Sequence, residues 1–242
     1  MGEIRASDGA AARAGGSTMS QQPLAIVAGA GPGFGRHLVH RLSHAGFNAF
    51  GLNRTQQDDQ RILSADLGDR VQVKQAIKDI VCTAGAPRLV VHNAARLVIA
   101  PFKETGPEVF LETWQSIVLS AVNVAHATLP AMVAGGGGTF IVSGATASLR
   151  GGAGFSAFAS AKAGLRALTQ SLAREYGPKG VHVVHVILDG ILDTEASRSR
   201  HSLDESRMMK LDHVADAYLH LASQPQSTWT FELDLRPMGE AF

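Results

Sequence analysis

A run of closely spaced glycines near the start of the sequence has the composition of a phosphate-binding loop. Residues 29–35 read Gly-Ala-Gly-Pro-Gly-Phe-Gly, and they stand between an apolar segment and an amphipathic one. Glycines at such a strand-to-helix turn let backbone N–H groups approach a pyrophosphate at the helix N-terminus. A plain turn is the alternative, since a lone glycine-rich loop is a weak signal. The position of the loop favours a nucleotide site, formed by Gly29, Gly31, Gly33, Phe34 and Gly35.

A second set of residues that could take part in a reaction lies on one helix, predicted at 155–177. Phe158 and Lys162 are four residues apart, so they lie one turn apart on the same face of this helix. The lysine ammonium donates hydrogen bonds and carries a charge, whereas a phenyl ring has no proton to exchange. This face therefore carries one ionisable group, Lys162, and no acid or base at position 158.

The end of the second predicted strand bears on the choice between the two nicotinamide coenzymes. An acidic residue there would accept hydrogen bonds from the adenosine ribose and would repel a 2′-phosphate. The sequence instead has Asn53, which carries no charge, and Arg54, which can offer several N–H donors to a phosphate. A solvated surface arginine is the alternative. The pair favours NADP(H) over NAD(H).

The elements that must position these residues alternate between short β-rich runs and helical stretches. Strands are predicted at 24–29, 48–53, 61–66, 88–93, 139–144, 181–188 and 230–235. Helices are predicted at about 33–46, 69–83, 108–134, 155–177 and 211–223. The alternation is typical of a doubly wound α/β fold, in which ligands bind beyond the carboxyl ends of the strands. No repeat or linker divides the chain, so residues 22–242 are predicted to form a single domain.

From about residue 23 to 242, the sequence resembles the short-chain dehydrogenase/reductase family. The motifs that carry the resemblance are Gly29-x-x-x-Gly33-x-Gly35, Asp66-Leu67, Asn93-Ala94-Ala95, Phe158-x-x-x-Lys162 and Gly190-x-x-x-Thr194. The resemblance implies a Rossmann-like parallel sheet of about seven strands. It also implies a bound nicotinamide nucleotide, a small-molecule substrate and a homodimer or homotetramer.

Around the adenine end of the nucleotide, the resemblance implies roles for residues after the third and fourth strands. Asp66 and Leu67 match the place where the family binds the adenine amino group. Asn93 and Ala94 match its Asn-Ala-Gly element, although Asn93 could equally hold two strands together. Ala95 departs from the glycine of that element.

At the nicotinamide end, the resemblance implies that Lys162 holds the ribose and that Gly190 and Thr194 contact the nicotinamide. Asp189 stands before Gly190, where the family has a proline. A structural role for Asp189 in its loop is favoured over a catalytic one.

The reaction centre of the family is a tetrad of asparagine, serine, tyrosine and lysine. Its tyrosine falls on Phe158, its serine on Ala145, and its asparagine on Ile117 when counted from Pro130. The catalytic positions are therefore Lys162, Phe158 and Ala145, and only the lysine keeps its type. Loss of a positioned general acid typically costs about 10²–10⁴ in rate. Ordinary carbonyl reduction through these positions is expected to be very slow.

Other groups near this centre could handle a proton, and apolar groups could hold a substrate. Water is one candidate for the proton, and the nearby hydroxyls are those of Ser143, Thr146, Ser148 and Ser156. The apolar candidates, which could equally be core residues, are Leu149, Phe155, Phe158, Leu192, Met208 and Met209. Tyr176 and Tyr218 are predicted to be packing residues. The polar stretch 195–210 stands where the family has a mobile lid.

His37, His40 and His44 share one face of the first helix, with no carboxylate or cysteine at ligand spacing. A solvated stripe is therefore favoured, and no metal site is predicted.

Composition narrows the possible partners and the expected location of the protein. A net charge of +1 argues against nucleic acid or an anionic membrane as the main partner. No uninterrupted apolar run reaches the roughly 20 residues that cross a bilayer. Cys82 is the single cysteine, favoured as a buried thiol, so no intrachain disulfide can form and a cytoplasmic location is expected. Residues 1–21 are predicted to be a flexible extension or a cloning remnant, and Met19 could be the native start.

The sequence thus predicts an NADP(H)-dependent oxidoreductase that moves hydride to or from a small apolar carbonyl or alcohol. A catalytically inactive nucleotide-binding or scaffold protein is the main alternative, because three of the four tetrad positions are replaced. Non-redox chemistry on the same fold is a third.

Overall fold

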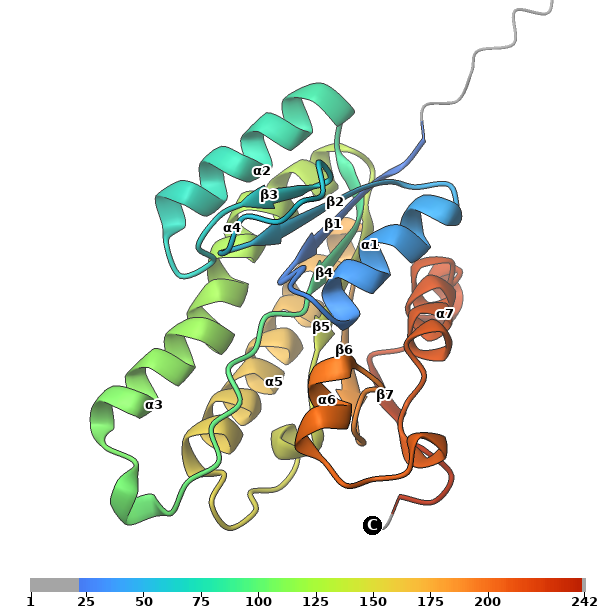
Figure 1. Ribbon diagram of the computed structural model, residues 1–242. Coiled ribbons are helices and arrows are strands. Elements are labelled where there is room, and N and C mark those ends of the chain that lie inside the picture. The colour runs from blue at the N-terminus through green and yellow to red at the C-terminus, as the bar shows by residue number, and fades with distance from the viewer. Residues whose placement is uncertain (1–21, 241–242) are drawn as a thin grey trace, which may run out of the picture.

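Within residues 22–240, which the computed structural model describes, seven parallel strands form one twisted sheet (Figure 1). In the order of the sheet, the strands are β3 (Ile62–Ser64), β2 (Asn48–Asn53), β1 (Leu24–Ala28), β4 (Pro87–His92), β5 (Gly138–Ser143), β6 (Val181–Leu188) and β7 (Glu232–Leu235). Every neighbouring pair runs parallel. The predicted Rossmann-like α/β fold is confirmed, and the expectation for residues 1–21 lies outside the described residues.

Helices connect the strands on both faces of the sheet. The α-helices are α1 (Phe34–His44), α2 (Arg70–Ala84), α3 (Pro107–Trp114), α4 (Ser120–Ala134), α5 (Ser156–Tyr176), α6 (Glu195–Arg200) and α7 (Leu211–Ala222). Short 3₁₀ turns are η1 (Phe102–Glu104), η3 (Thr146–Ser148), η4 (Gly177–Lys179), η5 (Glu205–Arg207) and η6 (Gln226–Thr228), and η2 (Gln115–Leu119) is a π-helix.

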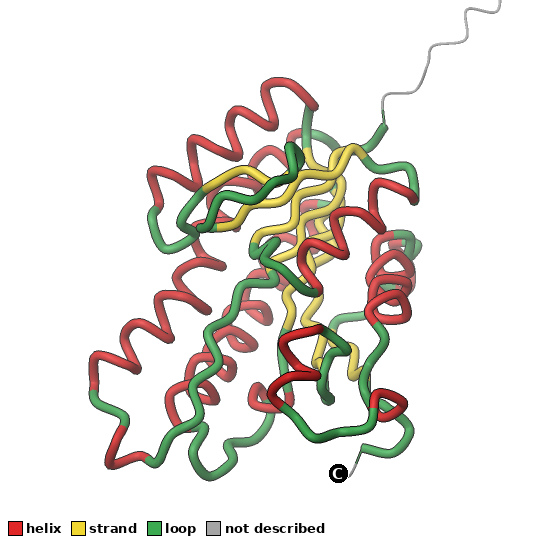
Figure 2. Tube along the Cα trace, in the orientation of Figure 1, coloured by secondary structure: helices red, strands yellow, loops and turns green. Residues whose placement is uncertain are grey.

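Helices lie on both faces of the sheet (Figure 2), and an apolar core fixes each helical layer against it. One core joins α2, α4 and α5 to one face through buried side chains such as Ile77, Leu129 and Leu165. The other joins α1 and α7 to the opposite face, with Leu38 and Tyr218 among its members. Because successive strand residues point to opposite faces, strands buried on both faces must be apolar throughout. This is why β1 reads "LAIVA" and is buried at every position.

The strand order reverses between β1 and β4, which is where ligands bind in folds of this class. From β1 the chain builds the sheet outward through β2 and β3, and it then returns to add β4 on the other side of β1. The connections that leave the carboxyl ends of β1 and β4 turn to opposite faces, which opens a crevice there. The glycine loop follows β1 and Asn93 follows β4, so both predicted motifs lie at this crevice.

One continuous helical segment, from Pro107 to Ala134, is long and apolar enough to cross a membrane by length and composition alone. Its mean hydropathy reaches 1.7 over the most apolar window, and 56% of that window is buried inside the protein. The segment contacts α2, α5 and β4, so it serves as a core helix of the fold. The π-helical turn η2 interrupts it at residues 115–119, and such bulges are frequent at functional sites.

Two local expectations differ from the structure. Cys82 is exposed, so the predicted buried thiol is wrong. The buried face of α2 runs through Val73, Ile77, Ile80 and Ala84, and residue 82 lies off that face. The second difference is that part of the polar stretch 195–210 forms a short helix, α6.

Candidate active site

The glycine loop is packed so tightly that side chains cannot replace its hydrogens. A Cβ atom at Gly29, where φ is +95°, would lie 2.5 Å from the backbone nitrogen of Ala94. A Cβ at Gly35 would lie 2.1 Å from the carbonyl oxygen of Gly29. The loop ends at α1, which has no acidic residue in its first turn and no side-chain cap. This uncapped N-terminus therefore favours an anion at this end of the helix.

A cavity of about 920 Å³, here called the polar cavity, lies along the crevice between β1 and β4. The predicted residues that line it are Gly29, Gly31, Asn53, Arg54, Asp66, Leu67, Asn93 and Ala94. They come from the ends of β1, β2, β3 and β4, which meet only in the folded chain. The Asn93 side chain also donates to the carbonyl oxygen of Gly29 at 3.2 Å, so it holds two strand ends together as well.

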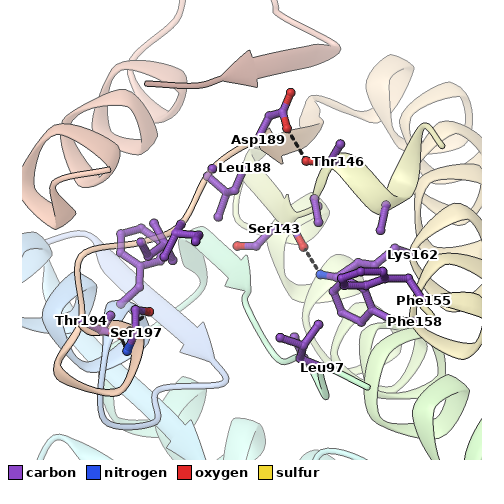
Figure 3. A pocket seen from close by; sticks show the side chains of 18 of the residues that line it. Leu97, Ser143, Thr146, Phe155, Phe158, Lys162, Leu188, Asp189, Thr194 and Ser197 are labelled. Atoms are coloured by element: carbon purple, nitrogen blue, oxygen red, sulfur yellow. Dashed lines mark hydrogen bonds between the residues drawn. The ribbon is translucent and has the colours of Figure 1, made fainter. Parts of the chain in front are cut away.

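A second cavity of about 710 Å³, here called the apolar cavity, adjoins the first (Figure 3). The predicted residues that line it are Gly33, Phe34, Asn93, Ala145, Phe158, Lys162, Gly190 and Thr194. Asn93 and Ala95 line both cavities, so the two form one crevice along the carboxyl edge of the sheet. Of the predicted nucleotide residues, only Gly35 lines neither, because it is buried in the first turn of α1.

Lys162 is the buried cation of the apolar cavity. Its side chain comes from α5, and the residue is only 3% exposed. The Nζ atom donates a hydrogen bond to the carbonyl oxygen of Ser143 at 2.8 Å and lies 5.8 Å from the centre of the Phe158 ring. Burial lowers the pKa of Lys162 from its ordinary value of 10.5 to about 8.

The hydroxyls of Ser143 and Ser148 are engaged elsewhere. The Ser143 hydroxyl pairs with the Tyr218 hydroxyl at 2.9 Å, on the opposite side of the sheet from α5. Burial raises the pKa of Tyr218, so this phenol stays protonated as a packing residue. The Ser148 hydroxyl accepts from the backbone nitrogen of Ala145 at 3.1 Å. Ser156 does not line the apolar cavity.

Asp189 is held in a buried ion pair. Its carboxylate accepts a hydrogen bond from the Thr146 hydroxyl, and it lies 3.0 Å from Nη2 of Arg236. The side chain is 5% exposed. This geometry favours the structural role for Asp189, which ties η3 and the segment after β7 to the cavity wall. An aspartate in an apolar strand end signals that a cation must lie nearby, but the sequence could not show that the cation is Arg236.

Position 117, where counting from Pro130 places the family's asparagine, holds a buried isoleucine. Ile117 lies within the π-helical turn η2, which contacts α5, and it is fully buried. The residue in this π-helical turn is therefore apolar and contributes no hydrogen-bonding side chain to the site. Asn123 lies further along α4 and donates to the carbonyl oxygen of Leu67 at 3.0 Å, where it supports the wall of the polar cavity.

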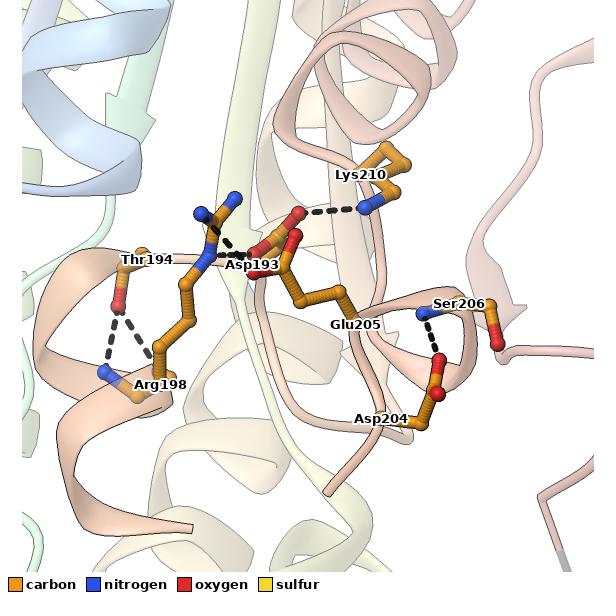
Figure 4. A network of polar contacts seen from close by, with 8 residues as sticks. Asp193, Thr194, Arg198, Asp204, Glu205, Ser206 and Lys210 are labelled. Carbon is orange, nitrogen blue, oxygen red and sulfur yellow. Dashed lines mark hydrogen bonds and ion pairs between the residues drawn. The ribbon is translucent and has the colours of Figure 1, made fainter. Parts of the chain in front are cut away.

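The carboxylate of Asp193 anchors the predicted lid, residues 195–210 (Figure 4). Asp193 lies 2.6 Å from Nε of Arg198 and 2.6 Å from Nζ of Lys210. These two partners lower the pKa of Asp193 to about 2. Thr194 caps α6 by accepting a hydrogen bond from the backbone nitrogen of Ser197 at 3.1 Å. The lid thus has a defined anchor at its entry, beside the apolar cavity.

Asp193→Asn is expected to loosen this lid, because an amide keeps the shape of the carboxylate but loses both ion pairs. Tryptic cleavage after Arg200 should become faster by roughly threefold to tenfold, while Asp58→Asn, at an exposed aspartate without an ion pair, should not change it. The anchoring is fully present above the ordinary carboxyl pKa of 3.8 and is lost as pH falls through about 2. Equal cleavage rates in both variants would contradict this role.

Of the apolar residues predicted near the substrate, three line the apolar cavity and three do not. Phe155, Phe158 and Leu192 line it. The other three are Leu149, which is exposed, and Met208 and Met209, which are buried. Sequence reasoning also missed Leu188, at the end of β6, and Leu97, in the loop after β4, where apolar residues give no distinct signal.

The histidines of α1 have carboxylate neighbours that sequence spacing did not reveal. His37 lies 2.9 Å from Asp212 of α7, and His40 lies 3.0 Å from Asp59. These are pairs, and among the described residues no group of three or more metal-ligating side chains comes together.

Comparisons with known proteins point to one family. The family model for short chain dehydrogenase matches residues 23–204. L-xylulose reductase of Mesocricetus auratus is 29% identical over 227 residues, which cover 85% of this chain and 91% of that protein. A crystal structure of a short-chain dehydrogenase from Rhodopseudomonas palustris is 33% identical, with a TM-score of 0.74, and the match covers 88% of this chain and 98% of that one.

A fourth comparison concerns the fold alone. The structure described as ElxO with NADP bound is 19% identical, with a TM-score of 0.81, and the match covers 88% of this chain and 96% of that one. The family model spans most of the chain, and the relatives named above cover most of their own length as well. This protein belongs to the short-chain dehydrogenase/reductase family of oxidoreductases.

Proposed function

We propose that this protein is an NADP(H)-dependent oxidoreductase that transfers hydride to or from a small apolar carbonyl or alcohol. The observation that carries the proposal is the intact nucleotide crevice. The loop that would meet the pyrophosphate has no room for side chains at Gly29 or Gly35, and the polar cavity beside it extends to the end of β2. A protein that served only as a scaffold would have no need to keep this arrangement.

The residues present fit a phosphorylated dinucleotide. The N–H groups at the start of α1 would hold the pyrophosphate, Asp66 the adenine, and Asn53 with Arg54 the 2′-phosphate. Lys162 would hold the nicotinamide ribose, with Gly190 and Thr194 at the nicotinamide end. When bound, the nicotinamide supplies or accepts the hydride.

Arg54→Gln is expected to weaken NADPH binding by about 10- to 100-fold, because a hydrogen bond to a charged group contributes about 1.5–3 kcal/mol. Arg54 is exposed and lines the polar cavity, and the described residues give its side chain no partner. NADH binding should stay the same, since NADH lacks the 2′-phosphate. Fluorescence titration measures both, with the exposed Arg61→Gln as the matched control. Equal loss of NADH and NADPH binding would argue against a 2′-phosphate contact.

The apolar cavity sets the substrate class. Leu97, Phe155 and Leu192 give it apolar walls beside the Phe158 ring, so a carbonyl with a small apolar substituent fits best. Arg150 and Arg200 also line the cavity, are exposed, and have no side-chain partner among the described residues. An acidic substituent on the substrate would find positive charge there. A useful panel therefore contains neutral ketones and keto acids of similar size.

Two measurements test the proposed function. Titration with NADPH and NADH by fluorescence should show submillimolar binding, tighter for NADPH. NADPH oxidation over the carbonyl panel should then show slow turnover. Failure to bind either coenzyme would overturn the proposal, whereas tight binding without any turnover would favour the scaffold function that the loss of hydroxyls at positions 145 and 158 suggests.

A further inference from the structure

We propose that Lys162 itself exchanges the proton with the substrate oxygen, so that a lysine is both the acid and the base of this active site. The proposal deepens the proposed function and rests on it, since it assigns the proton that must accompany hydride transfer to a carbonyl. The family's tyrosine position holds Phe158 here, and the proton needs another source.

The other protic groups at the strand ends are engaged or absent. Ala145 and Phe158 carry no ionisable hydrogen. The Thr146 hydroxyl donates to Asp189, whose charge is paired with Arg236. The other groups lining the apolar cavity that could exchange a proton, among them His201 and Glu240, belong to the lid and to the C-terminal segment, and an arginine such as Arg150 does not release a proton. Lys162 is therefore the protic group on the catalytic helix that faces the cavity.

The contacts of Lys162 leave donors free for a ligand. An ammonium has three N–H donors, and the structure uses one of them, toward the carbonyl oxygen of Ser143. Among the described residues, no carboxylate forms an ion pair with Nζ. Two donors thus remain for the ribose and for the substrate oxygen, within a cavity that Lys162 lines.

Two buried histidines flank the strand to which Lys162 is bonded. His92 of β4 and His185 of β6 pair with Val142 of β5 from either side, so the three residues form one row across the sheet. His92 Nε2 lies 2.8 Å from the Ser120 hydroxyl, and its Nδ1 has no partner among the described residues. His185 Nδ1 lies 3.2 Å from Glu232, and its Nε2 has no partner there either.

Among these buried neighbours, the charged form of Lys162 is raised in free energy relative to the neutral amine. Burial, with a smaller contribution from the charge of Lys162, lowers the pKa of His92 to about 3 and that of His185 to about 4, so the histidines are neutral at physiological pH. Glu232 is the carboxylate beyond His185, and Arg166 holds it at 2.6 Å. The ammonium therefore lies among neutral groups, which favours release of its proton.

The proton transfer balances in both directions. In reduction, the carbonyl carbon accepts hydride from the reduced nicotinamide while Nζ gives one proton to the carbonyl oxygen. The C=O π bond becomes the new O–H bond, and Lys162 is left as a neutral amine that solvent water reprotonates. In oxidation, the neutral amine takes the hydroxyl proton of the alcohol as hydride leaves its carbon for the oxidised nicotinamide.

The dependence of turnover on pH is the first test, measured at saturating NADPH from about pH 6 to about pH 10. An acid must be protonated to give a proton, so carbonyl reduction should be level below the Lys162 pKa of about 8. Above it, the rate should fall about tenfold for each pH unit. Alcohol oxidation with NADP⁺ should show the opposite profile and rise to a plateau above about pH 8.

Variants of Lys162 separate proton transfer from binding. Lys162→Met should lower turnover at saturating NADPH by about 10²- to 10⁴-fold. Lys162→Arg should lose turnover as well, because a guanidinium keeps its charge and its donors but does not release a proton. Lys179→Met, at an exposed lysine just after α5, is the matched control and should leave the rate unchanged.

A direct titration of the amine needs neither coenzyme nor substrate. In protein labelled with [ε-¹³C]lysine, one NMR signal should titrate with a midpoint of about 8. That signal should be missing from Lys162→Met. This measurement also stands if a Lys162 variant fails to fold.

Several results would overturn the proposal. They are a level pH profile, a Lys162 signal that titrates at its ordinary value of 10.5 instead of about 8, and full turnover by Lys162→Arg. If the inflection in the pH profile remains in Lys162→Met and is lost in His201→Gln, the proton would be assigned to His201 of the lid instead. Absence of NADPH binding would overturn the proposed function and this proposal with it. NADPH binding and turnover with a level profile would overturn the assignment of Lys162 alone.

Discussion

Phe158→Tyr combined with Ala145→Ser is expected to raise NADPH-dependent carbonyl reduction by about 10²- to 10⁴-fold, because it restores a positioned acid and a hydrogen-bond donor. Both positions line the apolar cavity, and Phe158 lies one helical turn from Lys162. A phenol there would be the acid, with the nearby ammonium to lower its pKa. The pH profile of the variant would then report the tyrosine and lysine as a coupled pair.

Matched variants test whether the gain in turnover depends on where the hydroxyl is added. Phe155→Tyr adds the same hydroxyl to another aromatic ring of the same cavity and should give no gain. The single variants Phe158→Tyr and Ala145→Ser should each give less than the pair, since such groups act as a unit. Unchanged turnover in the pair, with NADPH binding intact, would show that position 158 is not where the substrate oxygen lies. An inert wild type beside an active pair would support the scaffold function.

Much of the fold could be predicted because its signals are local. The strands β2 and β6 begin and end where the sequence predicts, at 48–53 and 181–188. Their apolar runs are bounded by turn residues, and a parallel sheet between two helical layers needs such runs. The least accurate strand is β3, predicted at 61–66 and found at 62–64, at the edge of the sheet where pairing on one side defines it less sharply.

The contacts that decide the chemistry could not be predicted, because they join residues far apart in the sequence. Arg236 neutralises Asp189 from the segment after the last strand. Tyr218 of α7 engages the Ser143 hydroxyl from the far side of the sheet. The row of His92 and His185 beside Lys162 depends on strand register, which the sequence does not state. The apolar walls of the cavity were predicted in part: Phe155, Phe158 and Leu192 line it, whereas Leu97 and Leu188 were not predicted.

Gly35→Ala is expected to destabilise the protein and to abolish submillimolar NADPH binding, although alanine is normally the better helix former. At a helical glycine with free space, this substitution stabilises by roughly 0.4–1 kcal/mol. A Cβ atom added at Gly35 would lie 2.1 Å from the carbonyl oxygen of Gly29 and 2.8 Å from Cα of Ala30, both backbone atoms. The phosphate loop must therefore move. Such overpacking costs about 1–3 kcal/mol, which lowers Tm by several degrees in a domain of this size.

Gly164→Ala is the matched control for that experiment, because it makes the same change inside α5. There the new Cβ would lie 3.6 Å from a methyl group of Val118, an ordinary contact, so Tm should stay the same or rise. Differential scanning calorimetry and NADPH titration compare the two variants. The same Gly→Ala change is predicted to lower Tm at Gly35 and to leave it unchanged or raise it at Gly164. Helix propensity therefore cannot account for the result. If Gly35→Ala were as stable as Gly164→Ala and bound NADPH normally, the close packing of the loop would not be what forms the nucleotide site.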